Sequence, residues 1–377
     1  MVRAVVWLGV VLTMSFLGGA PAVARGEVGG ISPYRGAILV DMESGEVLFA
    51  DNPDFSWPPA SMVKLMTVLV AMEAVAAGEV SLDDEVVASD WAAKMGGTQV
   101  WLASGERFPL SALLEAVLVG SANDASVAVA EHVAGSVPAF VARMNSRAKA
   151  LGLQNTELQS VHGLPPSKGQ RRDLMSARDL AQVARALESH PEVWRWAATK
   201  EAPFRDGKFT LRTTNWLLHS YPGITGLKTG FISIAGFGVT ATARRNGLSL
   251  VAVVLGAASK KASLREAARL LDHGFENHLV VHPVKQGQPV GAKIPVAGGT
   301  EDYFQGQAAR DLRMVVSRDA ARSLEIEVRV PGQLRAPITQ GQAVGEVVLV
   351  RGADIVSRVE ILAPRNIEAE SWFGSLW

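Results

Sequence analysis

The sequence of 377 residues contains no cysteine. No disulfide can form, so the fold must be stabilised by the burial of apolar side chains alone. The chain also lacks an excess of either charge, because 37 basic residues balance 37 acidic ones and neither sign forms a long block. Proteins that bind nucleic acid usually present a basic face, so a nucleic-acid partner is disfavoured. With 48% hydrophobic residues, a chain of this length can form two domains with ordinary cores.

No apolar stretch reaches the length of about 20 residues that a membrane-spanning helix needs. Near the start of the chain, Arg3 supplies a positive charge and an apolar core runs from Val5 to Leu17. The triplet 22–24 (Ala-Val-Ala) then has the small-x-small pattern of a cleavage site. These are the three parts of a secretory signal peptide. We therefore predict a signal peptide over residues 1–24, Arg25 as the first mature residue, and an exported protein of the periplasm or cell envelope.

Apolar periodicity divides the rest of the chain into two domains. The segments "RGAILVDMESGEVLFADNPD" and "AGFGVTATARRNGLSLVAVVLGA" are typical of β-hairpins, with turns at 43–45 (Glu-Ser-Gly) and at Asn246-Gly247. Amphipathic and apolar helical patterns lie between them, and a last helix, "SLREAARLLDHGF", follows. We predict an α+β domain over residues 31–279 whose terminal strands pair in one sheet. Alternating patterns then predict a smaller all-β domain over 282–364, followed by a tail over 365–377.

One helix of the middle region carries an unexpected charge. In "WPPASMVKLMTVLVAMEA", Ser61 follows two prolines and Lys64 opens an almost entirely apolar run. Residues i and i+3 lie on one helix face about 5–6 Å apart, so the two side chains can touch. A lysine near the positive end of a helix and partly desolvated tends to lose its proton, and a neutral amine can act as a base. We interpret Ser61 and Lys64 as a nucleophile and its base.

Two further motifs support this interpretation. About one Ser-x-x-Lys is expected by chance in a chain of this size, and Ser146 with Lys149 supplies a second instance. However, "SANDAS" places Ser121 and Asn123 at a break between two apolar helices, and "TGLKTGFIS" places the triplet 228–230 (Lys-Thr-Gly) just ahead of a predicted strand. Taken singly, the first could be a helix cap and the second a surface turn. The three motifs in this order are far less probable together.

With these motifs, the sequence resembles the penicillin-recognising serine enzymes, and within them the low-molecular-weight D-alanyl-D-alanine carboxypeptidases. The segments "VHGL" (161–164), "SARDLA" (176–181) and "REAARLLDHGF" (265–275) look like family segments, and the resemblance covers roughly residues 34–277. It implies a β-lactamase/transpeptidase-like fold: an antiparallel sheet flanked by helices, with the active site between the sheet and the helical lobe. The β-rich region looks like the second domain that many members carry.

The resemblance implies catalytic roles for the first two motifs. Ser61 would be the nucleophile, acylated by the penultimate D-alanine of a peptidoglycan stem peptide. Lys64 would take the Ser61 proton and later help to activate the hydrolytic water. Ser121 would relay a proton to the leaving amine, and Asn123 would hold Lys64 and the substrate amide.

The third motif would bind substrate. Lys228 would raise the local positive potential and attract the substrate carboxylate, which Thr229 would hydrogen-bond. Gly230 completes the motif, and the backbone N–H groups of Ser61 and Phe231 would form an oxyanion hole.

Several positions depart from the family pattern. Ala122 stands where a glycine is common, and Phe231 follows the third motif where carboxypeptidases often carry a polar residue. Ser263 lies near the place of a carboxylate-binding arginine. Arg265 is either a substitute for that arginine or a solvated helix residue. We leave His162 outside the catalytic set, because it can equally be a structural histidine.

We therefore expect a serine D-alanyl-D-alanine carboxypeptidase that trims pentapeptide stems and that β-lactams inhibit covalently. A class A β-lactamase needs an E-x-x-L-N-like segment between Asn123 and Lys228, and none is present. The alternatives are an endopeptidase that cuts D-alanyl cross-links and a non-catalytic peptidoglycan-binding scaffold. We expect no cofactor and no metal, and we interpret the region of His278 and His282 as a solvated turn.

The tail has two interpretations. As a helix it would carry four large apolar side chains within about 140° of one face: Trp372, Phe373, Leu376 and Trp377. Glu368 and Glu370 oppose anionic lipid, whereas Arg365 favours it. The tail either attaches loosely to the outer face of the cytoplasmic membrane, which is our prediction, or packs on the β domain or remains disordered.

Overall fold

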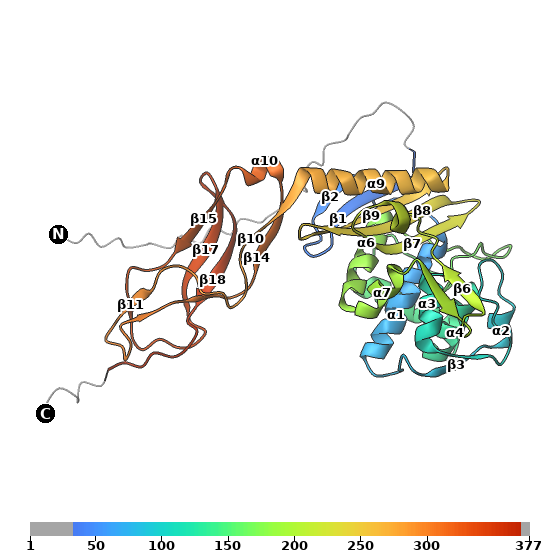
Figure 1. Ribbon diagram of the computed structural model, residues 1–377, viewed down its shortest axis with the longest axis horizontal. Helices are drawn as coiled ribbons and strands as arrows, with labels where there is room; N and C mark the ends of the chain where they lie inside the picture. The colour runs from blue at the N-terminus through green and yellow to red at the C-terminus, as the bar shows by residue number, and fades with distance from the viewer. Residues whose placement is uncertain (1–32, 371–377) are drawn as a thin grey trace.

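The computed structural model describes residues 33–370. These residues form an N-terminal α+β domain and a C-terminal β domain, placed end to end in an elongated molecule (Figure 1). The proposed signal peptide, with its cleavage site before Arg25, and residues 371–377 of the tail lie outside the described residues.

The N-terminal domain is built on one antiparallel sheet of five strands. In sheet order these strands are β2 (Val47–Asp51), β1 (Gly36–Asp41), β9 (Leu248–Ala257), β8 (Gly236–Arg245) and β7 (Ile224–Ile232). Both predicted hairpins are present, and β1 pairs with β9, for example at Ile38 and Val253. The ends of the domain therefore meet inside one sheet, as predicted. Strand β7 is an edge of the sheet and pairs with β8 on one side.

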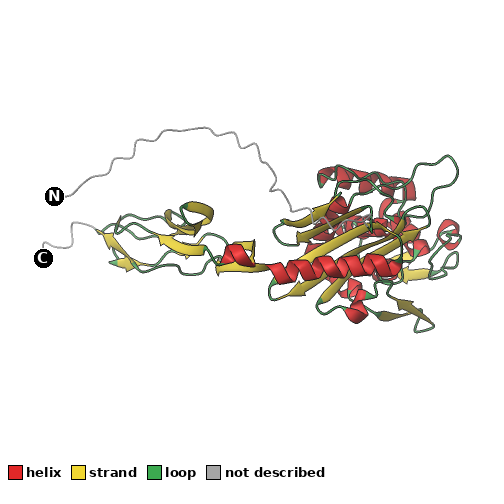
Figure 2. Ribbon diagram, turned by 90° about the horizontal axis from the view of Figure 1, so that it is seen from above, coloured by secondary structure: helices red, strands yellow, loops and turns green. Residues whose placement is uncertain are grey.

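Helices cover both faces of this sheet (Figures 1 and 2). The long helix α9 (Lys260–Asn277) lies along one face. The helical lobe on the other face contains η1 (Ala60–Val63), α1 (Lys64–Ala76), α2 (Asp90–Ala93), α3 (Leu110–Leu118), α4 (Asn123–Ala134), α5 (Val137–Ala150), α6 (Ala177–Ala186), η2 (Leu187–Ser189) and α7 (Pro191–Ala197). Strand alternation divides the core: Ile38 packs with the helical lobe and Leu39 with α9.

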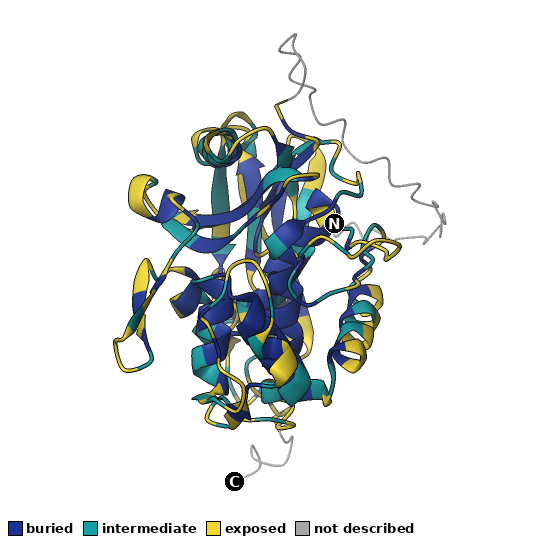
Figure 3. Cartoon of the chain, turned by 90° about the vertical axis from the view of Figure 1, so that its right-hand side faces the viewer, coloured by how far each residue is buried: buried dark blue, intermediate teal, exposed yellow. Residues whose placement is uncertain are grey.

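Three short elements complete this domain and were not anticipated from the sequence. They are the ribbon of β3 (Glu85–Val87) with β4 (Arg107–Pro109), the hairpin of β5 (Glu201–Phe204) with β6 (Phe209–Arg212), and the helix α8 (Leu217–Ser220). Helix α1 is buried on nearly all sides, which explains its continuous apolar sequence. Figure 3 shows the buried residues gathered where helices and sheet meet.

The C-terminal domain confirms the predicted β-rich fold. Its elements are β10 (His278–Val284), β11 (Ile294–Ala297), β12 (Tyr303–Phe304), β13 (Gln307–Ala308), β14 (Leu312–Ser317), α10 (Arg318–Ala321), β15 (Leu324–Arg329), β16 (Leu334–Arg335), β17 (Ala343–Arg351) and β18 (Asp354–Leu362). A core that includes Val347, Val359 and Ile361 holds its sheets together.

The interpretation of His278 and His282 as part of a solvated turn is wrong. Both residues lie in β10, which follows α9 without a loop and pairs with β14. His282 Nε2 lies 3.4 Å from a carboxylate oxygen of Asp311. The sequence pattern missed this strand because pairing with β14, more than thirty positions later in the chain, supplies its hydrogen bonds.

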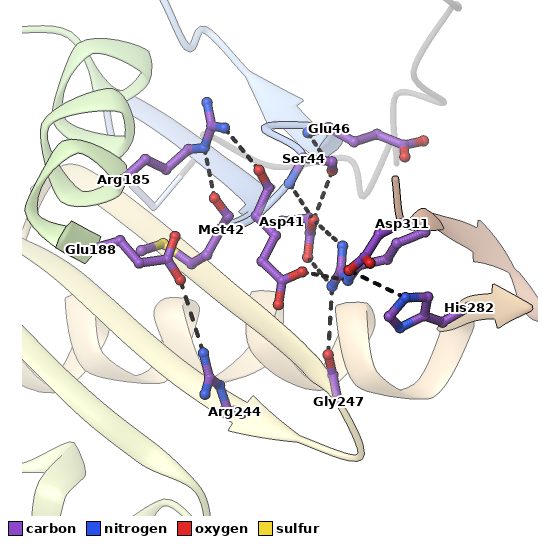
Figure 4. Close-up of polar contacts among 12 residues, drawn as sticks. Asp41, Met42, Ser44, Glu46, Arg185, Glu188, Arg244, Gly247, His282 and Asp311 are labelled. Atoms are coloured by element: carbon purple, nitrogen blue, oxygen red, sulfur yellow. Dashed lines mark hydrogen bonds and ion pairs between the residues drawn. The ribbon is translucent and has the colours of Figure 1, made fainter. Parts of the chain in front are cut away.

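An ion-pair cluster joins the two domains (Figure 4). Asp41, at the end of β1, is fully buried and accepts hydrogen bonds from the backbone N–H and the hydroxyl of Ser44. Arg313 of β14 reaches across, with its guanidinium 3.1 Å from Asp41 and 2.5 Å from Glu43. The C-terminal domain is therefore attached to the turn of the first hairpin as well as to the end of α9.

Within the described residues, no single helix has the length and apolar character of a membrane span. In this part of the chain, residues 33–370, α4 and α5 pass that test as a pair, and they are bent by 83° at the break between them.

Candidate active site

The first motif lies where the chain enters the helical lobe. After Pro58-Pro59 the chain forms the 3₁₀ turn η1, which contains Ser61, and the α-helix α1 then begins at Lys64. Side chains at i and i+3 eclipse each other in a 3₁₀ turn. The amine Nζ of Lys64 accordingly lies 3.2 Å from the hydroxyl Oγ of Ser61. The second Ser-x-x-Lys pair, Ser146 and Lys149, is exposed on α5.

The amine of Lys64 is enclosed by polar groups from two other segments. It donates to the side-chain oxygen of Asn123 at 2.6 Å and to the backbone carbonyl of His162 at 2.9 Å, and the residue is fully buried. Burial lowers the pKa of Lys64 well below its usual range, and the nearby charge of Lys228 lowers that pKa further. Asp124 acts in the opposite direction. Burial and the charge of Lys228 both favour the neutral amine, which is the form that a general base requires.

The second motif lies at the break between α3 and α4. Ser121 has a φ of 60°, a left-handed conformation that bulky residues adopt rarely and that often accompanies function. Its side chain is buried beside the start of α4. Asn123, the first residue of α4, donates from its amide nitrogen to the carbonyl of Gly96 at 2.7 Å. This bond directs the Asn123 oxygen toward Lys64.

A loop over residues 96–102 is tied to the start of α4. The backbone N–H of Asn123 donates to the carbonyl of Thr98, and the carboxylate of Asp124 accepts from the N–H groups of Val100 and Leu102. The role of Asp124 in supporting this loop was not predicted from the sequence, although its place directly after Asn123 is a signal that could have suggested it.

The third motif lies inside the edge strand β7, directly ahead of the predicted strand β8. Thr229 and Gly230 do not continue the alternation of apolar and polar residues that is typical of a strand. Nevertheless, Thr229 pairs with Val239 of β8 and Gly230 pairs with Gly238. Lys228 is buried, and its amine donates to the backbone carbonyl of Thr229 at 3.3 Å. Burial lowers the pKa of Lys228 to about 7. The hydroxyl of Thr229 bonds that of Thr214 at 2.7 Å, a contact that no sequence pattern marks.

Gly230 brings the first and third motifs together. A Cβ atom at this position would lie 2.6 Å from the carbonyl oxygen of Pro59 and 3.1 Å from the backbone nitrogen of Ser61. Only glycine permits β7 to pass this close to η1 without displacement. The backbone around Phe231, the next residue, is thereby placed beside the start of η1.

The "VHGL" segment forms another wall of the site. The carbonyl of Val161 accepts from the hydroxyl of Thr67 on α1, and a Cβ on Gly163, whose φ is 80°, would lie 2.0 Å from the carbonyl oxygen of Ala60. The ring of His162 accepts from the N–H of Leu164, and burial lowers the pKa of the ring to about 3. His162 therefore contributes its carbonyl, with a neutral ring, to the site.

The remaining candidates lie at the margin. The side chain of Phe231 is about half exposed and stacks on Phe237, with ring centroids 4.2 Å apart. Ser263 is buried in α9, and its hydroxyl donates to the carbonyl of Lys260. Arg265 pairs with Glu266 at 3.3 Å, and its side chain is 66% exposed. Among residues 33–370, no cluster of three His, Asp or Glu side chains could hold a metal ion.

Ser61, the buried Lys64 and an edge strand that carries a second buried lysine lie together on this α+β fold. Residues 33–259 match the D-alanyl-D-alanine carboxypeptidase family, and residues 280–369 match the C-terminal domain of penicillin-binding protein 5. The chain belongs to the D-alanyl-D-alanine carboxypeptidase family and is a serine-type peptidase of the cell wall. The resemblance and the fold predicted from the sequence are confirmed.

Known relatives extend over both domains. The chain is 32% identical over 338 residues to the D-alanyl-D-alanine carboxypeptidase DacF of Bacillus subtilis, covering 89% of this chain and 86% of the relative. Penicillin-binding protein 5 from Haemophilus influenzae has a similar structure, with a TM-score of 0.73, 27% identity, and coverage of 89% of this chain and 98% of that one. Penicillin-binding protein D2 from Listeria monocytogenes, solved in the ampicillin-bound form, has a TM-score of 0.59 at 29% identity, with coverage of 64% and 97%.

Proposed function

We propose that this protein is an exported enzyme that removes the terminal D-alanine from peptidoglycan pentapeptide stems through an acyl-enzyme on Ser61. The observation that carries the proposal is the 3.2 Å contact between the Ser61 hydroxyl and the amine of a fully buried Lys64. Membership of the carboxypeptidase family supports the reaction class.

In the first step, Lys64 takes the proton of the Ser61 hydroxyl while Oγ attacks the carbonyl carbon of the penultimate D-alanine. The peptide C–N bond then breaks, and Ser121 relays a proton from Lys64 to the departing amine of the terminal D-alanine. In the second step, a water molecule gives a proton to Lys64 and attacks the ester. The proton then returns to Oγ of Ser61 as the trimmed stem leaves. Asn123 holds Lys64 in place throughout, through the 2.6 Å bond.

The oxyanion of each tetrahedral intermediate would be held by the N–H groups of Ser61 and Phe231. The first N–H groups of a helix have no partner within the helix, and Ser61 is the second residue of η1. The close approach of Gly230 to the Ser61 nitrogen supports a shared site for both donors. Such a donor is typically worth about 3 kcal/mol of transition-state stabilisation.

The substrate would lie along β7 as an added strand, because this edge pairs with β8 on one side only within the described residues. Its terminal carboxylate would meet the amine of Lys228 and the hydroxyl of Thr229. A charged Lys228 also keeps Lys64 neutral, since it lowers the pKa of Lys64. The same geometry supports β-lactams as covalent inhibitors, which would acylate Ser61 in place of the stem peptide.

The proposal also assigns a role to each part of the chain. Residues 1–24 would be the signal peptide that directs export, 31–279 the catalytic domain and 282–364 the β domain. Residues 365–377 would attach the protein loosely to the outer face of the membrane. Sedimentation with anionic vesicles tests the last point: the full-length protein should pellet and a chain ending at Ala363 should not, and equal behaviour of the two would contradict it.

The central test is mass spectrometry of purified muropeptides. Monomers with pentapeptide stems and cross-linked dimers are incubated with the mature protein and with Ser61→Ala. We expect pentapeptides to lose one alanine with the wild type and none with the variant. Cleavage of dimers without trimming would instead assign an endopeptidase, and no change in either substrate would indicate a binding scaffold.

A further inference from the structure

A groove separate from the three motifs runs between α8 and the first half of α9. It has a volume of about 670 Å³ and is lined mainly by apolar groups. Trp216, at the N-cap of α8, forms one wall, and Leu264 and Ala268 lie on the α9 side together with Lys260 and Lys261. These α9 residues recur at intervals of three to four positions, so one continuous helix face borders the groove.

Both ends of the α8 wall are fixed to neighbouring elements. Before the helix, the buried Asn215 donates to the carbonyl of Gly226 on β7 at 3.0 Å and accepts from the N–H of Leu217. After the helix, the hydroxyl of Tyr221 donates to Asp272 of α9 at 2.8 Å. These hydrogen bonds fix the position of α8 relative to β7 and α9, and therefore the width of the groove.

The groove combines an aromatic surface with unneutralised positive charge. The indole of Trp216 is 59% exposed, and the amine of Lys260 lies 5.4 Å from its ring centroid. Neither Lys260 nor Lys261 has an ion-pair partner among residues 33–370, and both lie in the first turn of α9, where the helix dipole favours a negative charge. Burial lowers the pKa of Lys260, and an anion bound beside the amine would raise that pKa again. The nearest carboxylate of α9, Glu266, is occupied by Arg265 and Arg269.

The groove adjoins a segment that contacts the third motif. Trp216 lies two positions after Thr214, whose hydroxyl bonds that of Thr229 in the third motif. A long substrate that fills the active site therefore has this groove within reach. The proposed substrate is a polymer of sugar rings that carry anionic peptides, and an exposed indole suits the flat apolar face of a sugar, while paired lysines suit carboxylates.

We propose that this groove is a second binding site for peptidoglycan, which holds a sugar ring on Trp216 and stem-peptide carboxylates on Lys260 and Lys261, away from the bond that is cut. The inference rests on the proposed function. Two sites on one polymer act together, because binding at the first raises the effective concentration at the second. The groove would therefore favour polymeric substrate over a free pentapeptide.

Binding is tested with insoluble peptidoglycan sacculi and proteins that carry Ser61→Ala, so that no substrate is consumed. Trp216→Ala and, separately, Lys260→Ala with Lys261→Ala are each added to this background. Matched controls elsewhere on the N-terminal domain are Trp91→Ala, which is 49% exposed in the wild type, and Lys149→Ala with Lys208→Ala, both exposed. We expect the groove variants to need at least about fivefold more sacculi for half-maximal binding, the controls to match the parent, and added salt to reduce the difference made by the lysines.

Hydrolysis of a soluble pentapeptide by the same variants, with Ser61 intact, separates the two proposals. We expect kcat/KM for this substrate to stay within about twofold of wild type, because the short peptide does not reach the groove. Unchanged binding to sacculi would overturn the second site while leaving the proposed function intact. A loss on the pentapeptide as large as the loss on sacculi would also overturn it, since the groove would then act on the active site. Binding of the wild type to phosphatidylglycerol vesicles, lost in the groove variants while sacculi binding is unchanged, would assign the groove to lipid instead.

Discussion

A Cβ atom on Gly230 would lie 3.1 Å from the backbone nitrogen of Ser61, so the third motif is pressed directly against the first. Nothing in the spacing of the two residues along the chain requires this contact. The contact arises because β7 is an edge strand of the sheet and η1 packs beside it. A side chain at position 230 would prevent this packing, so the site requires a glycine there.

Gly230→Ala is expected to impair acylation strongly. The added methyl group would clash with Pro59 and displace β7 from η1, which separates the two proposed oxyanion donors. We expect the rate of labelling by a fluorescent penicillin to fall by about 100-fold or more and the free energy of unfolding to fall by about 1–3 kcal/mol. Gly332→Ala is the control, because a Cβ there meets no atom within 4 Å. Equal labelling rates for Gly230→Ala and wild type would contradict the shared oxyanion site.

The two buried lysines predict the pH dependence of acylation. Lys64 acts as a base only when neutral, so the rate should rise as pH rises through its lowered pKa. Lys228 attracts a carboxylate only when charged, so the rate should fall as pH rises through its pKa of about 7. In Lys228→Ala the descending limb should disappear. The ascending limb should move to higher pH, because the cation that lowers the pKa of Lys64 is gone.

Second-order rates of β-lactam acylation between pH 4 and pH 10 measure both limbs. Lys149→Ala, an exposed lysine on α5, should leave the profile unchanged. An ascending limb that stays in place in Lys228→Ala would show that the charge of Lys228 does not reach Lys64.

Lys228 should also destabilise the folded protein in a pH-dependent way. Burial lowers its pKa from the ordinary 10.5 to about 7 in the fold, so the unfolded chain binds more protons between these pH values. Stability from this group is therefore lost as pH falls from about 10 to about 7, and the loss levels off below about 7. Lys228→Met should be more stable than wild type by on the order of 3–5 kcal/mol below pH 7.

Urea unfolding of the wild type and of Lys228→Met, compared at pH 6, 7, 8 and 9, measures this difference. We expect the stability difference to shrink steadily from pH 7 to pH 9. A difference that is constant over this range would show that Lys228 is not neutralised by folding.

The contact between Arg313 and Asp41 should stabilise the junction of the two domains. Arg313→Ala removes the cation that neutralises the buried Asp41, although Ser44 still donates two hydrogen bonds to this carboxylate. We expect a loss of about 3 kcal/mol in unfolding free energy and a broader distribution of molecular dimensions in small-angle X-ray scattering. Arg143→Ala, which breaks an exposed pair with Glu79, should cost less than about 1 kcal/mol. Similar losses for the two variants would contradict a special role for Arg313.

Local patterns were sufficient for most of the fold. The Asn246-Gly247 turn, the alternation in β8 and β9 and the continuous apolar run of α1 each depend on neighbours in sequence, and the structure contains all of these elements. Sequence patterns failed where a segment is hydrogen-bonded to residues that lie far away along the chain. The interpretation of His278 and His282 as a turn was wrong because β14 completes their strand, and the bond between Thr229 and Thr214 was missed because it joins two separate segments.

For the site, the sequence by itself determined which residue types are available and that Ser61 and Lys64 touch, because three positions along a helical turn bring side chains together. Only the tertiary structure decided that Lys64 is fully buried, that Asn123 and the carbonyl of His162 hold its amine, and that Lys228 lies near enough to lower its pKa. It also decided that Arg265 pairs with Glu266 beside a groove that no motif announced. The physical reason is that desolvation and Coulomb interactions depend on distances in space, which a one-dimensional spacing does not contain.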